Sequence, residues 1–291
     1  MSTPTVAAPA TTYAVLRVCR TARLTPDMVR ITLTATDPAA LTDAGADQFA
    51  KLFFPLPGQD RPAVPPPVDE TAGVMSWYRQ YLAMPDEIRP PMRTYTIRAL
   101  RPALGELDID FVLHPDAAGP ASGWAAAAAP GHEIGLLCPP RALYRPPHEA
   151  AWQLLVGDET AIPAIGAIIE RLAPDTVLRA YIEVAGRDHE HDFTTRGHSR
   201  VVWVPRGTRR RGDAVLEAVR AAEFPEGAAY AWISGEAGLV KSVRRHLVRD
   251  RGIDKHAVTF TGYWRQGHSE EDTGREKVRR ADTGEPLRDD D

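Results

Sequence analysis

The first half of the chain alternates apolar and polar residues over short stretches. Six such stretches, each rich in Val, Ile, Leu, Thr or aromatic residues, begin near residues 12, 28, 50, 93, 106 and 132. Alternation with a period of two is typical of half-buried strands, and a series of short strands favours an antiparallel barrel or sandwich. The connection 55–91 holds nine of the 26 prolines. Because proline removes a backbone donor, we expect an extended excursion over the barrel there, with a helical turn or two at "WYRQYLAM".

The pattern changes at about residue 151. Apolar runs without alternation now lie between helical stretches at 162–172, 213–222 and 239–249, as in a doubly wound parallel sheet. After residue 267 there is little apolar content, which predicts a disordered tail. We therefore predict a β plus α/β two-domain protein. It has an N-terminal antiparallel β-barrel at 12–145, a Rossmann-like parallel α/β domain at 150–267 and a polar tail at 268–291.

Composition and charge exclude several classes of function. The net charge is −4 and the pI about 6.2, which argues against a general nucleic-acid binder because such proteins need a basic surplus. The N-terminal segment lacks a signal-peptide pattern and no run is long enough to span a bilayer, so we expect a cytoplasmic protein without stable membrane insertion. Cys19 and Cys138 are too few for a zinc site, an iron–sulfur cluster or a disulfide framework. Any redox chemistry must therefore use a bound organic cofactor.

The stretch "RTYTIR", residues 93–98, puts unusual chemistry on one predicted strand. Arg93 and Tyr95 face one side, while Thr96 and Arg98 face the other, so a flat ligand at the strand edge meets both sets. Arginine suits a pyrophosphate because its fork donates two parallel hydrogen bonds. Tyrosine can stack on a flat heteroaromatic ring while its hydroxyl stays hydrated. The alternative interpretation is an ordinary solvated strand face.

Residues 113–131, "LHPDAAGPASGWAAAAAPG", predict a short helix from about residue 123 to 129 with Ser122 as N-cap. The small residues Gly119, Ala121 and Ser122 let backbone amides approach a phosphate, and the helix dipole favours an anion there. A capped surface helix that binds nothing is the alternative.

Residues 154–168, "LLVGDETAIPAIGAI", predict a strand, a tight turn and a helix with Pro163 in its first turn. An α/β fold binds a dinucleotide at such a place. The glycine fingerprint is missing, however, and Asp158 and Glu159 would repel a pyrophosphate lying directly over the turn.

These stretches, in this order, resemble the siderophore-interacting proteins, which are flavin-dependent ferric-siderophore reductases related to ferredoxin–NADP reductases. The resemblance rests on "RTYTIR", on "LHPDAAGPASGW", on "GDETAIPAI", on "WISGEAG" at 232–238 and on "GYWRQG" at 262–267, and it spans roughly residues 13–268. Five ordered motifs make coincidence implausible.

The resemblance implies FAD on the barrel, with Arg93 on the pyrophosphate, Tyr95 packed on the isoalloxazine and Thr96 near the reactive N5 edge. The rest of the FAD would be held by Arg98, His114, Gly119, Pro120, Ala121 and Ser122. It also implies NADPH or NADH on the α/β domain, less firmly assigned to Asp158, Thr160, Pro163, Ser234, Gly235 and Glu236. Two departures stand out: the segment 183–193 differs from the family's simpler acidic version, and Pro115 replaces a common glycine.

Several cations extend this hypothesis. Arg206, Arg187 and the "RGTRRRG" cluster could bind an adenosine 2′-phosphate, although a run of charges is usually a solvated face. We predict that Lys51 and Arg265 attract an anionic ferric chelate. His189 and His191 beside Asp192 lack a third ligand of clear spacing, so we predict no metal site. Trp152, Trp203 and Trp232 are expected in the core.

The predicted activity is an NAD(P)H-dependent reduction of a ferric siderophore, which releases Fe(II) during iron acquisition. A nicotinamide gives two electrons at once and Fe(III) takes one, and a flavin can handle both. No protein acid or base is required by this scheme, and we expect a monomer. Two alternatives stay open: a flavin reductase with another acceptor, such as ferredoxin or a small molecule, and a non-catalytic siderophore-binding protein. The sequence leaves the choice between NADPH and NADH open.

Overall fold

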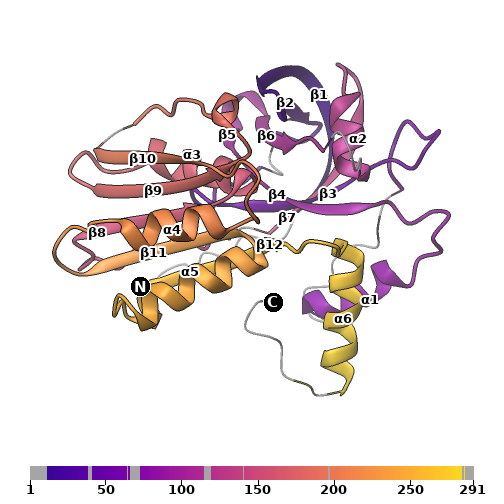
Figure 1. Ribbon diagram of the computed structural model, residues 1–291. Coiled ribbons are helices and arrows are strands. Elements are labelled where there is room, and N and C mark those ends of the chain that lie inside the picture. Colours follow the sequence, from indigo (N-terminus) through magenta and orange to yellow (C-terminus); the bar gives the residue numbers. More distant parts are fainter. Residues whose placement is uncertain are drawn as a thin grey trace, which may run out of the picture.

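The computed structural model describes residues 12–38, 41–63, 65, 73–114, 119–139, 141–195, 197–283 and 285. Two sheets follow one another along this chain, an antiparallel one and then a parallel one (Figure 1). None of the helices in these described ranges combines the length and apolar character that a bilayer span needs.

The first sheet has seven strands in the order β4-β3-β7-β1-β2-β6-β5, and every pair in it is antiparallel. The strands are β1 (Thr12–Thr25), β2 (Met28–Ala35), β3 (Phe49–Phe53), β4 (Met92–Thr96), β5 (Ala99–Arg101), β6 (Glu106–Val112) and β7 (Glu133–Cys138). The two outermost strands, β4 and β5, are separated along the chain by only Ile97 and Arg98. The Arg98 N–H also donates to the Asp108 carbonyl of β6. The sheet therefore curls back on itself as a barrel, as the alternation predicts.

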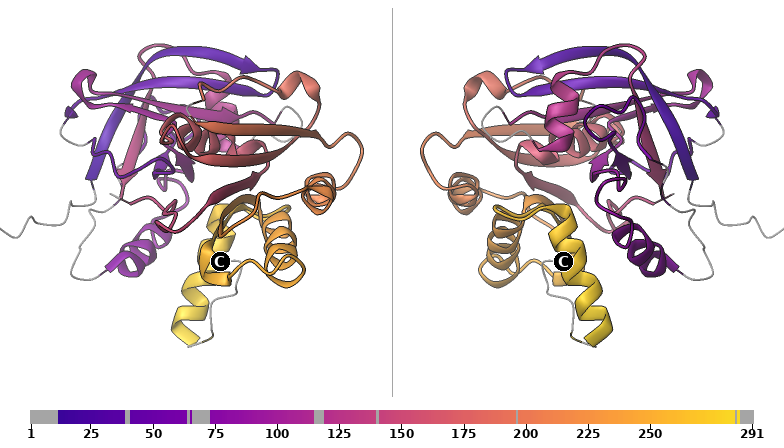
Figure 2. Two further views of the ribbon diagram at one scale, coloured as in Figure 1. Left: turned by 90° about the vertical axis from the view of Figure 1, so that its left-hand side faces the viewer. Right: turned by 90° about the vertical axis from the view of Figure 1, so that its right-hand side faces the viewer.

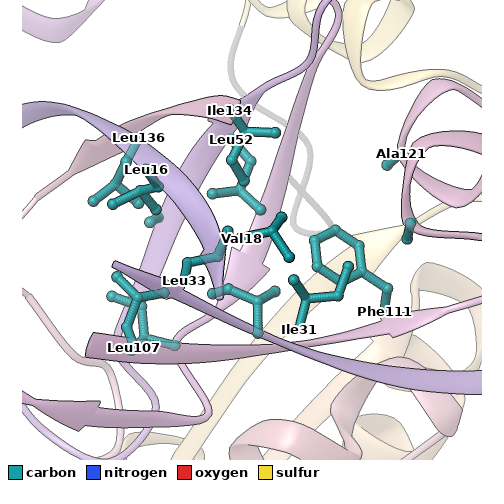
Figure 3. Packing of buried hydrophobic residues seen from close by; sticks show 14 of the residues in the cluster. Leu16, Val18, Ile31, Leu33, Leu52, Leu107, Phe111, Ala121, Ile134 and Leu136 are labelled. Atoms are coloured by element: carbon teal, nitrogen blue, oxygen red, sulfur yellow. The ribbon is translucent and has the colours of Figure 1, made fainter. Parts of the chain in front are cut away.

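Apolar side chains of the barrel strands fill its interior (Figure 3). Leu16, Ile31, Leu52 and Leu107 come from four different strands and are fully buried. Because successive side chains of a strand point to opposite faces, one residue in two supplies this core. A one-residue slip of any strand would move its core residues to the outside, so the alternating pattern fixes the register.

The second sheet has five parallel strands in the order β10-β9-β8-β11-β12. They are β8 (Trp152–Gly157), β9 (Val177–Val184), β10 (His198–Pro205), β11 (Ala229–Glu236) and β12 (Val258–Trp264). Helix α3 (Ile162–Glu170) covers one face, while α4 (Asp213–Ala221) and α5 (Ala237–Arg249) cover the other. On β8, Leu155 packs toward α3, while Leu154 and Val156 pack toward α4 and α5. Both faces are buried, which is why these strands lack alternation.

The two sheets share part of their core. Met28 of β2 is buried in the same hydrophobic cluster as Ile162 and Ile165 of α3. In addition, the indole Nε1 of Trp232 on β11 donates a 2.9 Å hydrogen bond to the Asp47 carboxylate, which precedes β3. Trp152 and Trp232 are buried as expected, whereas Trp203 is only partly buried.

The polar tail contains a helix, so the prediction of a disordered segment is wrong for residues 270–283. Helix α6 (Glu270–Thr283) lies beside α1 (Gly73–Leu82), which includes most of the expected helical stretch "WYRQYLAM" (Figures 1 and 2). Val278 of α6 packs against the aromatic cluster that Trp77 and Tyr81 of α1 form with the barrel. Of the nine prolines in the excursion, only Pro66 and Pro67 lie outside the described residues.

Helix α6 also approaches α1 closely at one position. A Cβ atom at Gly274 would lie 2.1 Å from the Tyr78 hydroxyl oxygen, so only glycine permits this contact. The stability of α6 therefore comes from tertiary contacts, which cannot be predicted from the amino-acid composition of the helix.

Candidate functional site

Strand β4 carries the predicted flavin contacts at the edge of the barrel sheet. Thr96 is buried at its end, and Tyr95 is half-buried with its ring centroid 4.5 Å from that of Phe111. Burial raises the pKa of Tyr95, and the nearby Arg93 charge opposes this effect. The phenol therefore stays protonated at neutral pH.

Tyr263 of β12 joins the two sheets, and the sequence analysis did not single it out. Its hydroxyl interacts with the side chains of both Thr96 on β4 and Ser234 on β11. The Tyr263 side chain is 37 % exposed. Desolvation is nevertheless the main effect that raises its pKa, the Asp47 charge adds to it, and the two hydroxyl partners oppose the rise. The motif "GYWRQG" pointed to this stretch but not to the tyrosine. The contact brings a predicted flavin residue and a predicted nicotinamide residue to one point.

The turn after β8 is organised by Asp158, which is 2 % exposed. Its carboxylate accepts from the Thr160 N–H at 2.9 Å and hydroxyl at 2.6 Å, from the Glu236 N–H at 2.8 Å and from the Trp264 Nε1 at 3.0 Å. Burial raises the pKa of Asp158, and the Thr160 hydroxyl is the main effect against it. Asp158 thus ties β8, β11 and β12 together at their carboxyl ends. Because protein donors already occupy its oxygens, Asp158 holds the turn and the strand ends of the site in position.

Glycines make room for this carboxylate. A Cβ atom at Gly235, where φ is +138°, would lie 2.8 Å from the Asp158 carboxyl carbon. A Cβ at Gly157 would meet the Ser234 carbonyl oxygen at 2.7 Å. The next predicted residue, Glu236, caps α5, because its side chain accepts from the Gly238 and Leu239 amides at 2.6 and 3.0 Å. Pro163 is buried in the first turn of α3, as expected.

An interdomain pocket of about 330 Å³ opens beside this turn. Its lining combines His114 from the barrel with Thr160, Arg206, Arg211 and Trp264 from the α/β half. The pKa of His114 is lowered by desolvation and by the Arg211 charge, so its imidazole is neutral at pH 7.

Two arginines in this pocket converge on one carboxylate. Arg206 donates to Glu159 at 3.0 Å and Arg211 does so at 3.3 Å. The guanidinium of Arg211 also lies 5.2 Å from the Trp264 ring centroid. Arg206 also lies 3.7 Å from the buried Glu183, and Asp27 is a second acid in the pocket lining, so the positive charge of the two arginines is matched by nearby carboxylates.

The short helix after β6 starts earlier than predicted. Helix α2 (Pro120–Ala126) has Gly119 as its N-cap, whereas we expected residues 123–129 with Ser122 as the cap. Proline at the first helical position explains the early start, because its φ suits a helix and its missing N–H costs nothing there. Ser122 instead accepts a 2.8 Å hydrogen bond from the His114 N–H. Among the described residues, which do not include 115–118, no side chain caps α2, and none has an atom within 4 Å of a Cβ built on Gly119.

Acidic residues of α6 pair with two predicted cations. Lys51 Nζ lies 2.9 Å from Glu270, which also accepts from the Thr94 N–H and hydroxyl at 2.8 Å each. Arg93 Nη1 lies 2.5 Å from Glu271. Within the described residues, Arg93 donates only through Nη1, to the Met92 carbonyl and the Glu271 carboxylate, so Nε and Nη2 remain for another acceptor.

Two further arginines were predicted at the site. Arg98 is 8 % exposed, and its two terminal nitrogens bind Glu170 of α3 at 2.8 and 2.6 Å. This bidentate pair joins the barrel to the α/β half, and an FAD role for Arg98 stays a prediction. Arg265 forms a backbone bridge with His268 just before α6.

The two histidines that resemble a metal cluster differ in their surroundings. His189 Nε2 lies 3.7 Å from carboxylate oxygens of both Asp27 and Asp188, whereas His191 lies among aromatic rings. His191 packs against the rings of Phe193 and Trp203 at centroid distances of 5.1 and 5.4 Å, and desolvation lowers its pKa. In the described ranges, no three His, Cys, Asp or Glu side chains are grouped as metal ligands.

A barrel that leads into a five-stranded parallel sheet is the fold of the ferredoxin reductase-like proteins, and a ferredoxin reductase matches at a TM-score of 0.63 with 14% identity. Two family models match in sequence: the siderophore-interacting FAD-binding domain over residues 17–143 and the siderophore-interacting protein over residues 150–267. The chain belongs to the siderophore-interacting protein family.

Relatives and a solved structure agree with this assignment. The ferric vibriobactin reductase ViuB of Vibrio cholerae is 30% identical, with 84% of this chain and 86% of the relative covered. The NADPH-dependent ferric-chelate reductase of Escherichia coli is also 30% identical, with 86% and 91% covered. A siderophore utilization protein from T. fusca is 33% identical, with 89% and 95% covered and a TM-score of 0.75.

The residues on the barrel fit an FAD in two respects. The uncapped first turn of α2, with open space at Gly119, can receive a phosphate. Arg93 keeps donors for the same purpose, at the edge of the strand that carries Tyr95 and Thr96.

Proposed function

We propose that this protein is an FAD-dependent NAD(P)H reductase that reduces a ferric siderophore and so releases Fe(II). The observation that carries the proposal is the junction at Tyr263, where hydroxyls of the barrel and of the parallel sheet converge. A donor on one sheet and an acceptor on the other must meet at such a point, because electron transfer and hydride transfer need close approach.

The barrel residues bind and orient the cofactor in this proposal. Arg93 and the amides of the first turn of α2 neutralise the phosphates, while Tyr95 and Thr96 border the ring system. When bound, FAD accepts two electrons together and passes them on singly. His114 is neutral and lies in the interdomain pocket, where it contributes a hydrogen-bonding group without adding charge.

The α/β residues hold the reductant. Asp158 fixes the turn, and Ser234 and Thr160 present hydroxyls beside it. Arg206 and Arg211 are the proposed partners of an adenosine 2′-phosphate, which favours NADPH over NADH. The ferric-chelate reductase of Escherichia coli, named for NADPH dependence, supports this preference.

The substrate is a ferric chelate, and Lys51 and Arg265 are the proposed cations that attract it. One NAD(P)H supplies two electrons and leaves NAD(P)⁺ and a proton, while two Fe(III) chelates each take one electron. Oxygen ligands bind hard Fe(III) more strongly than softer Fe(II), so reduction weakens the complex. Glu270 balances the charge of Lys51. The affinity for an anionic chelate therefore depends on α6.

The test begins with the visible spectrum of the purified protein under argon, before and after adding NADPH or NADH. We expect a flavin spectrum that is bleached by the nicotinamide and restored by a ferric chelate, with Fe(II) trapped by a chromogenic ligand at two per nicotinamide. Thr96→Val should slow the bleaching at unchanged FAD content. Thr21→Val, at an exposed threonine of β1, is the control and should leave it unchanged.

Other outcomes contradict the proposal. A colourless protein that refuses added FAD removes its basis. A bound flavin that neither nicotinamide bleaches points to a siderophore-binding protein without reductase activity. Bleaching followed by transfer to ferredoxin or a free flavin, but not to ferric chelates, indicates a reductase with another acceptor.

A further inference from the structure

A second concave site lies on α5, away from the interdomain pocket. It is a groove of about 680 Å³ between α5, the short helix η5 (Lys255–Ala257) and β12, which is an edge strand of the parallel sheet. It shares no lining residue with the interdomain pocket. We call it the basic groove, because its lining includes Lys241, Arg244, Arg245, Arg249 and Lys255.

The helix brings these cations together. Lys241, Arg245 and Arg249 are spaced four residues apart, so they lie in a row on one face of α5. Like charges at this spacing repel one another, which is unfavourable for the helix. Eight residues of helix span about 12 Å, so the positive charges follow a line of that length. The chain as a whole is acidic at −4, which makes this local surplus unusual.

Among the described residues, no carboxylate pairs with these cations. Within the part of the chain that the structure describes, none of the five cations has a salt bridge or a side-chain hydrogen bond to a protein group. Elsewhere in the same half, arginines such as Arg206 and Arg209 are paired with glutamates. The basic groove is therefore a set of donors without acceptors.

Arg244 is fixed in place at the floor of the groove. Its guanidinium carbon lies 4.2 Å from the ring centroid of Phe260 on β12, a cation–π contact. Its Nε atom is buried and has no hydrogen-bond partner. Buried donors are normally satisfied, so an unpartnered one beside a concave basic surface points to an acceptor that the protein does not supply.

We propose that the basic groove binds a small polyanion with a linear chain of phosphate groups. Its volume is in the range of small-molecule sites, and arginine forks match phosphate oxygens. A single phosphate would reach only part of the row from Lys241 to Arg249, whereas a chain of phosphates supplies charges along a line, as the cations do. This site is separate from the proposed reductase chemistry and stands without it.

The experiment measures binding of tripolyphosphate to the FAD-loaded full-length protein by calorimetry at two salt concentrations. We expect one site, at least tenfold weaker binding in Lys241→Glu and in Arg245→Glu, and a further loss at the higher salt. Both side chains are exposed and unpaired, and each glutamate would face an opposite charge four residues away, so folding is not at risk. An unchanged melting temperature in both variants confirms that they are folded.

Matched controls make the outcome decisive. Arg200→Glu changes the net charge equally on β10, at the opposite edge of the same sheet, and should bind like the wild type. Arg206→Ala tests the interdomain pocket and should leave tripolyphosphate binding unchanged. Orthophosphate and citrate should each bind at least tenfold more weakly than tripolyphosphate. Binding that is absent, equal in Lys241→Glu and wild type, lost in Arg206→Ala, or matched by orthophosphate or citrate overturns the proposal.

Discussion

Helix α6 contacts the barrel through Glu270, the Glu271–Arg93 ion pair and Val278, and removing the Glu270 side chain should loosen the helix. Glu270 receives Lys51 Nζ at 2.9 Å and the Thr94 N–H and hydroxyl at 2.8 Å each. A partly exposed ion pair is worth about 0–1 kcal/mol, and a hydrogen bond about 1 kcal/mol net. Glu270→Ala should therefore weaken the docking of α6 by about 2 kcal/mol, an increase of about thirtyfold in the undocked population.

Hydrogen exchange followed by mass spectrometry measures this population directly. Amides of α6 should exchange about thirtyfold faster in Glu270→Ala, while those of the two sheets are unchanged, because local opening is separate from global unfolding. Asp282→Asn is the control. It removes a surface pair with Arg79, in which both side chains are about half exposed, and should change exchange by less than about threefold. Exchange of α6 in Glu270→Ala within threefold of wild type would refute the assigned role of Glu270.

Three other substitutions test the site and the core. Arg206→Ala should raise the KM for NADPH about tenfold or more, because one charge-assisted phosphate contact is lost, and should leave the KM for NADH within about twofold. Equal changes for both nucleotides would contradict the 2′-phosphate assignment. Gly235→Ala should destabilise the protein by about 1–3 kcal/mol, since φ is +138° and the new Cβ would press on Asp158. Calorimetry should show a Tm lower by several degrees, and an unchanged Tm would exclude the strain. Burial lowers the pKa of His191 below about 6.5 in the folded state. As the pH drops below that value the unfolded chain therefore binds the proton first, and the free energy of unfolding falls. His191→Phe should flatten this fall in denaturant titrations from about pH 7 to about pH 5, and an unaltered slope would show that another group causes it.

The sheets could be predicted because their signals are local. Alternation identified the barrel strands, and the unbroken apolar run at 152–157 identified a strand buried on both faces. Helix α6 gave no such signal. Two glutamates against the edge strand β4, a valine in the aromatic cluster and a glycine against Tyr78 hold it. Thr94, one partner of Glu270, lies 176 residues away in the chain. Long-range pairing of this kind leaves no periodicity to detect.

In the candidate site, too, the local features could be predicted and the long-range pairings could not. The motifs located the strand at 93–98 and the turn at Asp158, and the structure brings Thr96 and Ser234 together at Tyr263. The partners of the site arginines could not be predicted. Glu271, which pairs with Arg93, and Glu170, which pairs with Arg98, come from other elements, and an arginine in a sequence gives no hint of which distant acid it meets. The N-terminus of α2 was misplaced because Ser122 is a good cap in isolation, whereas Pro120 starts the helix.

The hydrophobic cluster shared by Met28 and α3, together with the Trp232–Asp47 hydrogen bond, has a practical consequence for cutting the polypeptide. A protease nick in the connection near residues 146–149 would break no buried contact of that cluster. The two fragments should stay associated and elute as one species until denaturant is added. Each fragment made separately would expose its half of the joint to water, and should aggregate unless its complement is present.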